Sequence, residues 1–433
     1  MPVSGQDLIG QRIRLTRRQR GLSQAQLAHP ELSDSYVSLI ESGKRTPTAA
    51  VLELLAAKLE CSLTYLINGV TAEQMQELEL RLGYASLALN NGEVAEARQR
   101  YAELLEDGSL VGLRSLLHQA EYGYALASEA CGDLDEAISV LSRLREAATE
   151  TPPTDQTLAI AVALSRCYRE RGDLTAAVQV GEESLFGTDR PAWNDGLVEL
   201  GATLLGAYIV RGDLLRARQF ASELLAAAEM LGTPRSTVAA CWNAAVVADL
   251  TGRGDEALSL VERALAVQSE TGDPRNLARL RMEYAVLLLR TRPSEAKACR
   301  DLMLRGEREL AESSAGTVDL ARAAIYLAKA EFVLGNAKKA AEYARRGRDM
   351  LNERTPALLA EGRLVLSSAL LLLNEATEAT VELLAVEQSL EQTPNSRKAA
   401  EGWLSTARVL ERLDDGGAAS VDAYQRALAS VGL

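Results

Sequence analysis

The chain has 433 residues, a formal net charge of −13 and an aromatic content of only 4%. This length exceeds one ordinary hydrophobic core and indicates several domains or a repeat array, while the composition favours helices over strands. No run of 18 apolar residues is present and the N-terminus lacks a signal-peptide pattern. We therefore expect no membrane span and no signal peptide, and we place the protein in the cytoplasm.

Residues suited to metal, redox or hydrolytic chemistry are sparse. The five cysteines form no C-x-x-C pair, and the only histidines are His29 and His118. A redox or metal site is one interpretation of the cysteines, but we favour small buried side chains in a reducing cytoplasm. Two isolated histidines are too few for the usual zinc sites and catalytic triads. We expect no metal, no cofactor and no enzymatic activity.

The charge is unevenly distributed along the chain. Residues 1–70 contain eight Lys/Arg and six Asp/Glu, whereas the remaining residues contain 39 and 54. Five arginines fall within nine positions near the N-terminus, namely Arg12, Arg14, Arg17, Arg18 and Arg20. The acidic bulk is thus separate from a basic N-terminal segment, which suits an interaction of that segment with nucleic acid.

Five short helices are predicted between residues 5 and 69. The first is expected over about 7–20 and is ended by Gly21, and the second begins with a Ser23–Gln26 capping box and is ended by Pro30. The third is capped by Ser33 and ended by Gly43. The fourth is capped by Thr48, and the fifth is expected over 63–67. The second and third helices with the intervening turn are typical of a helix-turn-helix, which places one helix in the DNA major groove.

The motifs Leu22-Ser23-Gln24, Leu27-Ala28 and Val37-Ser38-Leu39-Ile40-Glu41-Ser42-Gly43-Lys44-Arg45-Thr46-Pro47 resemble the Xre/Cro/repressor family of helix-turn-helix domains. The resemblance implies that Gln24 contacts a phosphate and braces the third helix, and that Arg17 and Glu41 form an ion pair between the first and third helices. It implies phosphate contacts from Lys44 and Arg45. The DNA-binding residues expected on this basis are Gln24, Ser33, Asp34, Ser35, Tyr36, Ser38, Lys44 and Arg45.

Two departures from the family pattern affect what this segment can recognise. The turn Pro30-Glu31-Leu32 is one residue short and lacks the usual glycine, and Asp34 is acidic where relatives place a neutral or basic residue. An acid in the groove repels phosphate but accepts from a cytosine amino group. For Tyr36 we favour packing against the sugar-phosphate backbone over base readout. The alternative interpretation is that these five helices form a bundle that does not bind DNA, and that the charges of the first helix lie on a solvent-exposed face.

A period of 40 residues dominates the rest of the chain. Glycines recur at Gly92, Gly132, Gly172, Gly212 and Gly252, and each is followed five residues later by alanine. We expect each glycine to end the first helix of a pair and each alanine to lie where two helices approach closely. Aspartates follow three of the glycines and suit the start of the second helix: Asp133, Asp173 and Asp213. Prolines near the unit ends are expected to stop the second helix: Pro152, Pro153, Pro191, Pro234, Pro274, Pro356 and Pro394.

The alanine series continues at Ala296, Ala340, Ala379 and Ala419, which gives about nine helix pairs. Gly-Asp-Leu-x-x-Ala resembles tetratricopeptide repeats, although a 40-residue period also suits HEAT-like arrays. Both alternatives predict a curved stack of helix pairs with a concave groove. The fold class is all-α: a five-helix helix-turn-helix domain over 1–70 and a tetratricopeptide-like α-solenoid over 71–433, the latter for ligand binding and dimerisation.

In tetratricopeptide units the first helix lines the groove, and counting back from each glycine gives the inward positions. The ligand-binding residues expected there are Gln119, Tyr122, Arg166, Arg169, Glu199, Trp242, Asn243, Arg281 and Arg322. Mixed charges with apolar walls suit a peptide. The alternative is that at least half of these residues lie on ordinary solvent-exposed helix faces and do not bind a ligand.

The combination of a helix-turn-helix with such an array resembles the peptide-sensing RRNPP quorum regulators. The resemblance implies a homodimer on a two-fold operator in double-stranded DNA, with a short signalling peptide in each groove that shifts the population between two states. Our hypothesis is a ligand-controlled, sequence-specific transcriptional regulator. The alternative hypothesis is a DNA-binding regulator whose array docks a protein partner. An enzyme has almost no support, because no catalytic constellation is marked by spacing.

Overall fold

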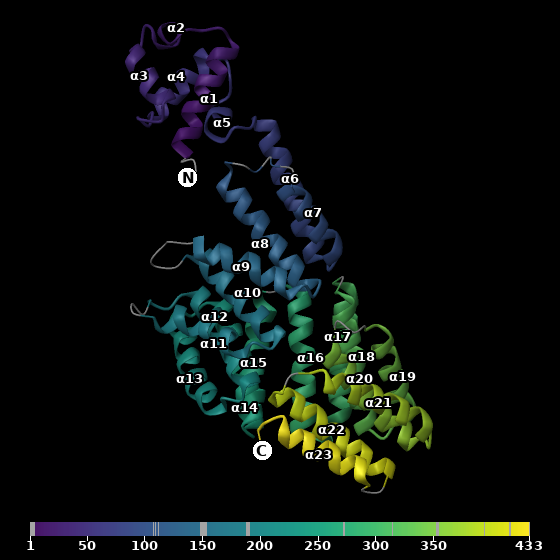
Figure 1. Ribbon diagram of the computed structural model, residues 1–433. Helices are drawn as coiled ribbons and strands as arrows, with labels where there is room; N and C mark the ends of the chain where they lie inside the picture. The colour runs from purple at the N-terminus through teal and green to yellow at the C-terminus, as the bar shows by residue number, and fades with distance from the viewer. Residues whose placement is uncertain are drawn as a thin grey trace. The chain divides into compact units, whose positions relative to one another are not determined.

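The computed structural model describes residues 5–106, 108, 110, 112–147, 154–187, 191–271, 273–313, 315–351, 355–393, 395–414 and 417–432. These residues form 23 α-helices, one 3-10 helix and no strand (Figure 1), so the predicted all-α fold class is confirmed. The chain divides into two compact units, Met1–Cys131 and Gly132–Leu433, which are described separately below.

The first five helices share one small core. They are α1 (Gly5–Gln19), α2 (Gln24–Ala28), α3 (Asp34–Glu41), α4 (Ala49–Lys58) and α5 (Leu63–Asn68). Fully or nearly fully buried side chains from all five pack together: Ile13, Leu27, Ala28, Val37, Ile40, Leu52, Leu55, Ala56, Leu59 and Leu66. Apolar residues at helical spacing therefore give each short helix one buried face, and this shared burial stabilises helices that are too short to be stable alone.

The local signals that start and stop these helices are mostly as predicted. Ser23 forms a capping box with Gln26, Ser33 accepts the backbone N–H of Tyr36, and Gly21 follows α1 with φ of 71°. Thr48 is an exception: it stands at the N-cap position of α4, but its side chain accepts no capping hydrogen bond. The prediction of a Thr48 cap was therefore correct in position and wrong in its interaction.

Eighteen helices follow in chain order as nine successive pairs, the number predicted. Their bounds are α6 (Ala72–Asn90) and α7 (Val94–Glu106); α8 (Arg114–Ala130) and α9 (Leu134–Ala147); α10 (Asp155–Arg171) and α11 (Leu174–Phe186); α12 (Asp195–Arg211) and α13 (Leu214–Leu231); α14 (Pro234–Leu250) and α15 (Gly254–Thr271); α16 (Pro274–Thr291) and, after the 3-10 helix η1 (Pro293–Glu295), α17 (Ala296–Glu312); α18 (Thr317–Val333) and α19 (Ala337–Asp349); α20 (Pro356–Leu372) and α21 (Ala376–Glu391); α22 (Arg397–Asp414) and α23 (Ala418–Ala429).

The 40-residue period has the structural basis expected of it. The five periodic glycines all have φ between 78° and 94°, the left-handed conformation that closes a helix. The alanines of the series from Ala97 to Ala379 are at most 3% exposed, so helix backbones approach closely there. The last member is wrong, because Ala419 is exposed and the neighbouring Ser420 is the buried residue.

The aspartates and prolines of the repeat turns need partial correction. Asp173 accepts the backbone N–H of Ala176 as a cap, whereas the side chain of Asp213 caps nothing and pairs with Arg211 instead. Pro234, Pro274 and Pro356 do not simply stop the preceding helix, because each occupies the first residue of the next one. Proline suits that position since its missing N–H has no intrahelical acceptor there. Pro152, Pro153 and Pro394 lie outside the described residues.

Within the second unit, the first helices of the pairs pack on one another in two runs. Each packs on the next from α10 to α14 and from α16 to α22, and α22 also contacts α12, so the second run winds back to the first. Because α12 and α22 are both first helices, the first helices face the inside of this turn. This is the arrangement that the tetratricopeptide resemblance implies for a concave surface.

Two further properties of the described residues concern burial and hydropathy. All five cysteines are free; Cys167, Cys241 and Cys299 are buried, and Cys61 and Cys131 are half-buried. Among the described helices, none combines the length and the apolar character needed to cross a bilayer.

Candidate functional site

Helix α3 has one buried and one exposed face. Val37 and Ile40 are within 1% of full burial, while Ser35, Ser38 and Asp34 are exposed. The Ser33 hydroxyl caps the helix by accepting the Tyr36 N–H at 3.3 Å. A short helix capped at its start and exposing small polar side chains has the form required of a helix that enters a DNA groove.

A buried ion pair fixes α3 to α1. Arg17 Nε and Nη2 donate to the two carboxylate oxygens of Glu41 at 2.5 and 2.9 Å, and Arg17 Nη1 donates to the Leu22 carbonyl at 2.7 Å. Gln24 Nε2 donates to Glu41 Oε2 at 2.9 Å. Burial opposes ionisation of Glu41, but the hydrogen bonds from Arg17 and Gln24 outweigh it and lower the pKa of Glu41. The ion pair and the bracing contact implied by the family resemblance are both present.

The cluster of N-terminal arginines divides into two groups. Arg12 donates to the carbonyls of Leu66 and Ile67, Arg17 pairs with Glu41, and Arg20 pairs with Glu60. Arg14 and Arg18 are exposed and make no ion pair among the described residues, like Lys44 and Arg45 in the loop after α3. The side chains available for phosphate are therefore Arg14, Arg18, Lys44 and Arg45, only two of which were predicted.

Two contacts at the exposed side of α3 were not predicted. The Arg45 guanidinium lies over the Tyr36 ring, 4.9 Å from its centroid. His29 Nε2 lies 3.3 Å from Asp34 Oδ1, the acid that departs from the family pattern. The stacking fixes the half-buried Tyr36 beside a cation, which suits packing of the ring against a sugar-phosphate backbone.

The predicted DNA-binding residues thus lie together on one part of the first unit. Ser33, Asp34, Ser35, Ser38, Lys44 and Arg45 are exposed, whereas Gln24 and Tyr36 are half-buried. The amide of Gln24 is engaged by Glu41, so its role in the structure is bracing. The DNA contacts of all eight residues remain predictions.

All nine predicted ligand residues lie on first helices of the pairs. Gln119 and Tyr122 belong to α8 in the first unit; the others belong to α10, α12, α14, α16 and α18 in the second. Arg169 extends over Gly206 of α12, where a Cβ would lie 2.6 Å from its Nη1. Half-buried Trp242 packs against the core cluster of the second unit, and Asn243 donates to the carbonyl of Ala239 one turn earlier.

Two of the predicted ligand-binding charges are neutralised by neighbouring helices. Glu199 accepts two hydrogen bonds from Arg235 of α14, at 2.5 and 2.6 Å, and Arg281 pairs with Glu309 of α17. These two residues are therefore less available to a ligand than the sequence suggested. Their partners lie one helix pair away or within the same pair, which indicates a structural contribution to the array.

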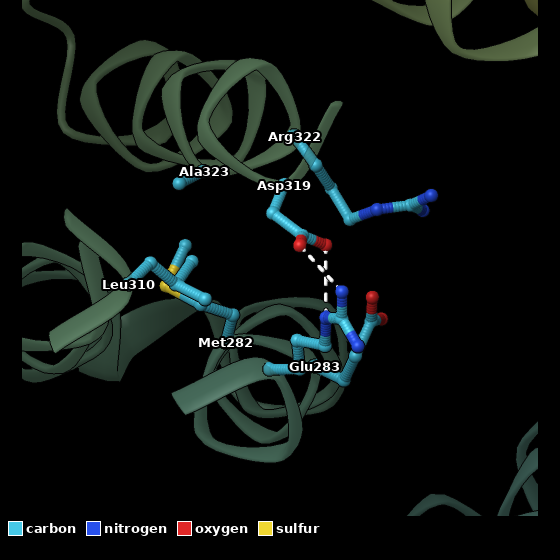
Figure 2. A pocket seen from close by; sticks show the side chains of 7 residues that line it. Met282, Glu283, Leu310, Asp319, Arg322 and Ala323 are labelled. Atoms are coloured by element: carbon cyan, nitrogen blue, oxygen red, sulfur yellow. Dashed lines mark hydrogen bonds and ion pairs between the residues drawn. The ribbon is translucent and has the colours of Figure 1, made fainter. Parts of the chain in front are cut away.

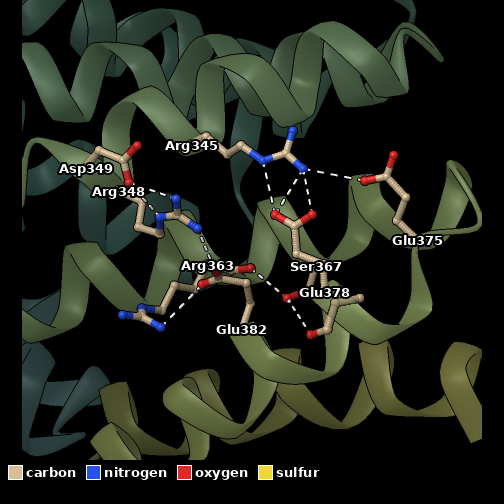
Figure 3. A network of polar contacts seen from close by, with 9 residues as sticks. Arg345, Arg348, Asp349, Arg363, Ser367, Glu375, Glu378 and Glu382 are labelled. Atoms are coloured by element: carbon tan, nitrogen blue, oxygen red, sulfur yellow. Dashed lines mark hydrogen bonds and ion pairs between the residues drawn. The ribbon is translucent and has the colours of Figure 1, made fainter.

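Ion pairs between successive helix pairs recur near the repeat spacing. They join residues 36 to 41 positions apart: Arg235 with Glu199, Arg145 with Glu183, Arg346 with Glu307, Arg279 with Asp319, and Arg290 with Asp249. A denser network links α19, α20 and α21 (Figure 3), where Arg345 donates to Glu378 and Glu375, and buried Glu382 accepts from Arg348 and Arg363. These contacts fix the register of the stack.

A cavity of about 280 Å³ lies between α16, α17 and α18 (Figure 2). Met282, Leu310 and Ala323 form its apolar wall, and Arg279, Glu283, Asp319 and Arg322 provide its charges. Arg279 and Asp319 neutralise each other through two hydrogen bonds of 3.0 and 2.6 Å. Only Arg322 of this set was predicted, because the later repeats lack the glycine that anchored the alignment.

Arg322 differs from Arg279, the other arginine that lines the cavity. It makes no ion pair among the described residues, but it interacts with the Tyr326 hydroxyl. That hydroxyl donates a hydrogen bond of 2.8 Å to the nearby Glu283. Burial raises the pKa of Glu283, and the Tyr326 hydrogen bond and the charge of Arg322 oppose that rise. Burial also raises the pKa of Tyr326, as do the nearby Glu283 and Glu361. Half-buried Arg322 is therefore a cation that an anionic group could engage.

No arrangement suited to a metal is present among the described residues: no three His, Cys, Asp or Glu side chains gather closely enough to hold an ion.

Comparisons with known proteins agree with this architecture. Residues 13–66 match a family model described as helix-turn-helix, and residues 116–185 match one described as tetratricopeptide repeat. No curated protein matches the sequence significantly. A solved structure of a Rap protein complexed with Competence and Sporulation Factor is 14% identical, covers 82% of this chain and 97% of its own, and has a TM-score of 0.55.

Two other solved structures also match the chain. A signal-transduction ATPase of the STAND class with a tetratricopeptide repeat sensor, from Pyrococcus horikoshii, is 13% identical over 96% of this chain and 63% of its own, with a TM-score of 0.50. PlcR of Bacillus thuringiensis, in complex with the peptide PapR7 and DNA, is 17% identical over 78% and 99%, with a TM-score of 0.29. The chain thus carries an Xre-type helix-turn-helix domain followed by tetratricopeptide repeats, in a fold similar to that of Rap.

Proposed function

We propose that this chain is a sequence-specific transcriptional regulator that binds double-stranded DNA through α3 and is controlled by a short peptide bound to its repeat array. The observation that carries the proposal is the exposed polar face of α3, flanked by Lys44 and Arg45 and locked to α1 by the buried Arg17–Glu41 pair. The match to a helix-turn-helix model over residues 13–66 supports it. Helix α3 would contact base edges, and Arg14, Arg18, Lys44 and Arg45 would contact phosphates.

A mobility-shift assay with genomic fragments at moderate salt tests the DNA-binding proposal. The full chain should select particular fragments over bulk DNA, and Lys44→Ala/Arg45→Ala should weaken binding to all sequences alike. A matched control is Lys338→Ala/Lys339→Ala, which removes the same charge from two exposed lysines of α19 that make no ion pair among the described residues. Absence of any site-selective binding, or equal loss in both variants, would overturn the proposal.

The ligand proposal rests on the cavity beside Arg322. At about 280 Å³ it suits one anchoring residue rather than a whole peptide, since pockets for larger ligands run to about 300–1,000 Å³. An apolar side chain would fill the wall of Met282, Leu310 and Ala323, and a carboxylate would pair with Arg322. The rest of the peptide would follow the first helices of the second unit past the predicted ligand residues there. The similarity of fold to Rap, solved in complex with Competence and Sporulation Factor, supports a ligand at this array.

Native mass spectrometry of the protein purified from its host tests the ligand proposal. A bound peptide should be recovered with the unaltered chain, and Arg322→Gln should lower its affinity by about 10- to 100-fold, the range expected for one charge-assisted contact. The control is again the α19 double variant. A stable stoichiometric protein in place of a peptide would instead support the alternative, a regulator whose array docks a protein.

The remaining assignments follow from the same proposal. Residues 1–70 bind DNA, and residues 71–433 bind the ligand and dimerise. A homodimer places two copies of α3 on a two-fold operator, and the ligand shifts the population between states with different spacing of these helices. The protein acts in the cytoplasm, and no catalytic activity is assigned to it.

A further inference from the structure

Helix α6 is the first helix of the array, and among the described residues one of its sides is left largely uncovered. A first helix inside the array, such as α10, packs against the preceding α9 as well as α11 and α12, and buries seven residues. By contrast, α6 packs against α7 and α8 and buries only Leu78, Ala85 and Ala88. The side that a preceding repeat would cover is therefore open.

This open side is apolar. Leu80, Tyr84 and Leu87 are 56%, 51% and 53% exposed, and at spacings of four and three residues they lie on one face of α6. Gly83 lies among them, and a Cβ at Gly83 would have no atom within 4 Å. We call these four residues the α6 stripe. Terminal repeats of solenoids need a polar outer face for solubility, so an apolar stripe at this position indicates a surface that another molecule covers.

We propose that a second copy of this chain docks on the α6 stripe, with the two α6 helices antiparallel about a two-fold axis. The sequence of the stripe is self-complementary in this register. An axis between Gly83 and Tyr84 sets Leu80 opposite Leu87 of the second copy and Gly83 opposite Tyr84 of the second copy. Each tyrosine ring then covers the glycine that faces it, and the small residue lets the helices approach closely.

The charges of α6 favour the same arrangement. In this antiparallel register Glu77 lies opposite Asn90 of the second copy, so its carboxylate meets no other carboxylate. A parallel pair would place each Glu77 opposite its own copy, where like charges repel. The helices α1–α5 belong to the same compact unit and leave the stripe exposed, so the N-terminal domain of the same chain is not its occupant.

The location of the stripe connects the dimer to DNA recognition, and this consequence rests on the proposed function. Only residues 69–71 separate the end of α5 at Asn68 from the start of α6 at Ala72. Pairing of two α6 helices would therefore hold two N-terminal domains close together and constrain the spacing of their α3 helices. Half-sites one helical turn of DNA apart require such a constraint.

Sedimentation velocity of the full chain without DNA tests the inference. The unaltered chain should be a dimer, and Leu80→Glu should raise the dimer Kd by about 100-fold, because a two-fold dimer contains the substitution twice. The double variant Leu80→Glu/Leu87→Lys should recover most of the affinity, since the antiparallel register brings the introduced carboxylate of one copy to the introduced ammonium group of the other. Leu215→Glu on α13 is the matched control, because Leu215 is 73% exposed outside the stripe and should leave the dimer unchanged.

Circular dichroism of each variant checks that the exposed substitutions leave the helices folded. A monomeric unaltered chain, or a dimer that survives Leu80→Glu, would overturn the inference, and so would a failure of the double variant to recover. Val421 and Leu428 are exposed apolar residues of α23. If changing them abolishes the dimer and changing Leu80 does not, the inference is also overturned. A monomer that still selects DNA fragments would overturn the dimer surface and the two-fold operator, and would leave DNA recognition by α3 standing. A dimer without DNA selectivity would overturn the proposed function and leave the dimer surface standing.

Discussion

Replacing Glu41 by glutamine should loosen the attachment of α3 while leaving its shape intact. The substitution keeps the volume of the side chain and removes its charge, so the Arg17 guanidinium, whose side chain is 10% exposed, loses its counter-ion. Breaking a buried pair by removing one partner costs about 3–5 kcal/mol. At the lower end, about 3 kcal/mol corresponds to roughly 150-fold in an equilibrium constant.

Hydrogen exchange of the full chain measures this effect where it arises. Backbone amides of α1 and α3 should lose about 100-fold or more in protection, whereas amides of the repeat array should be unchanged. The matched control is Glu60→Gln, which removes the partner of Arg20 at a site where Glu60 is 77% exposed. An exposed pair of this kind contributes at most about 1 kcal/mol, so protection should change by less than about fivefold.

A second variant separates charge from geometry. In Arg17→Met/Glu41→Leu both charges are gone, and replacement of a buried pair by apolar residues is often neutral or stabilising. The double variant should therefore regain most of the protection lost in Glu41→Gln. Equal exchange protection in Glu41→Gln and Glu60→Gln would show that the buried ion pair does not hold α3 in place. A double variant with no more protection than Glu41→Gln would contradict the role assigned to the unpaired Arg17 charge.

Three further predictions address charge, pH and packing. Removing Lys44 and Arg45 together should reduce the slope of log K against log salt by about 1.8 per domain, at ~0.9 for each phosphate contact; a slope measured from 50 to 200 mM salt that does not change would exclude both contacts. The pKa of Glu41 is lower in the folded chain than its value of ~4.3 in the unfolded chain, so the stabilising contribution of Glu41 is present above that unfolded pKa and is lost as the pH falls further. Exchange protection of α3 should therefore be steady from about pH 7 to 5 and decline below about pH 4. Gly123→Ala should destabilise the α7–α8 contact by about 1–3 kcal/mol, because its Cβ would lie 2.3 Å from the Tyr101 ring; unchanged exchange in α7 and α8 would contradict this.

The architecture was predictable because its determinants are local or periodic. A residue with φ near 90° strongly favours glycine, so Gly172 and Gly212 mark helix ends in the sequence itself. A position where two helix backbones meet favours alanine, which made the nine pairs countable. The last repeat shows the limit of the pattern: its buried position is taken by Ser420, which is small enough to fit but carries no alanine signal.

The electrostatic details of the two sites were less predictable, because they depend on partners distant in the sequence. Arg12 lies in the same basic run as Arg14, yet its guanidinium is taken by the carbonyls of Leu66 and Ile67, which any residue could provide. No sequence signal distinguishes these two arginines. The contact of Arg45 with Tyr36 likewise depends on the path of the loop after α3.

The ion pairs of the array did leave a signal that the sequence interpretation overlooked. Arg235 and Glu199 are 36 positions apart, and Arg279 and Asp319 are 40 apart, close to the glycine period. Opposite charges at that spacing on equivalent helices indicate contacts between repeats. The same rule assigns Glu199 to the framework of the array.

Recognition of particular DNA sequences by the exposed face of α3 can be measured by sequencing the fragments that the full chain selects from a random duplex library. A two-fold motif whose half-sites are about one helical turn apart should be enriched. Ser35→Ala/Ser38→Ala should lose that motif while residual nonspecific binding is retained. Selection of no motif by the unaltered chain, or an unchanged motif in the variant, would contradict recognition by α3.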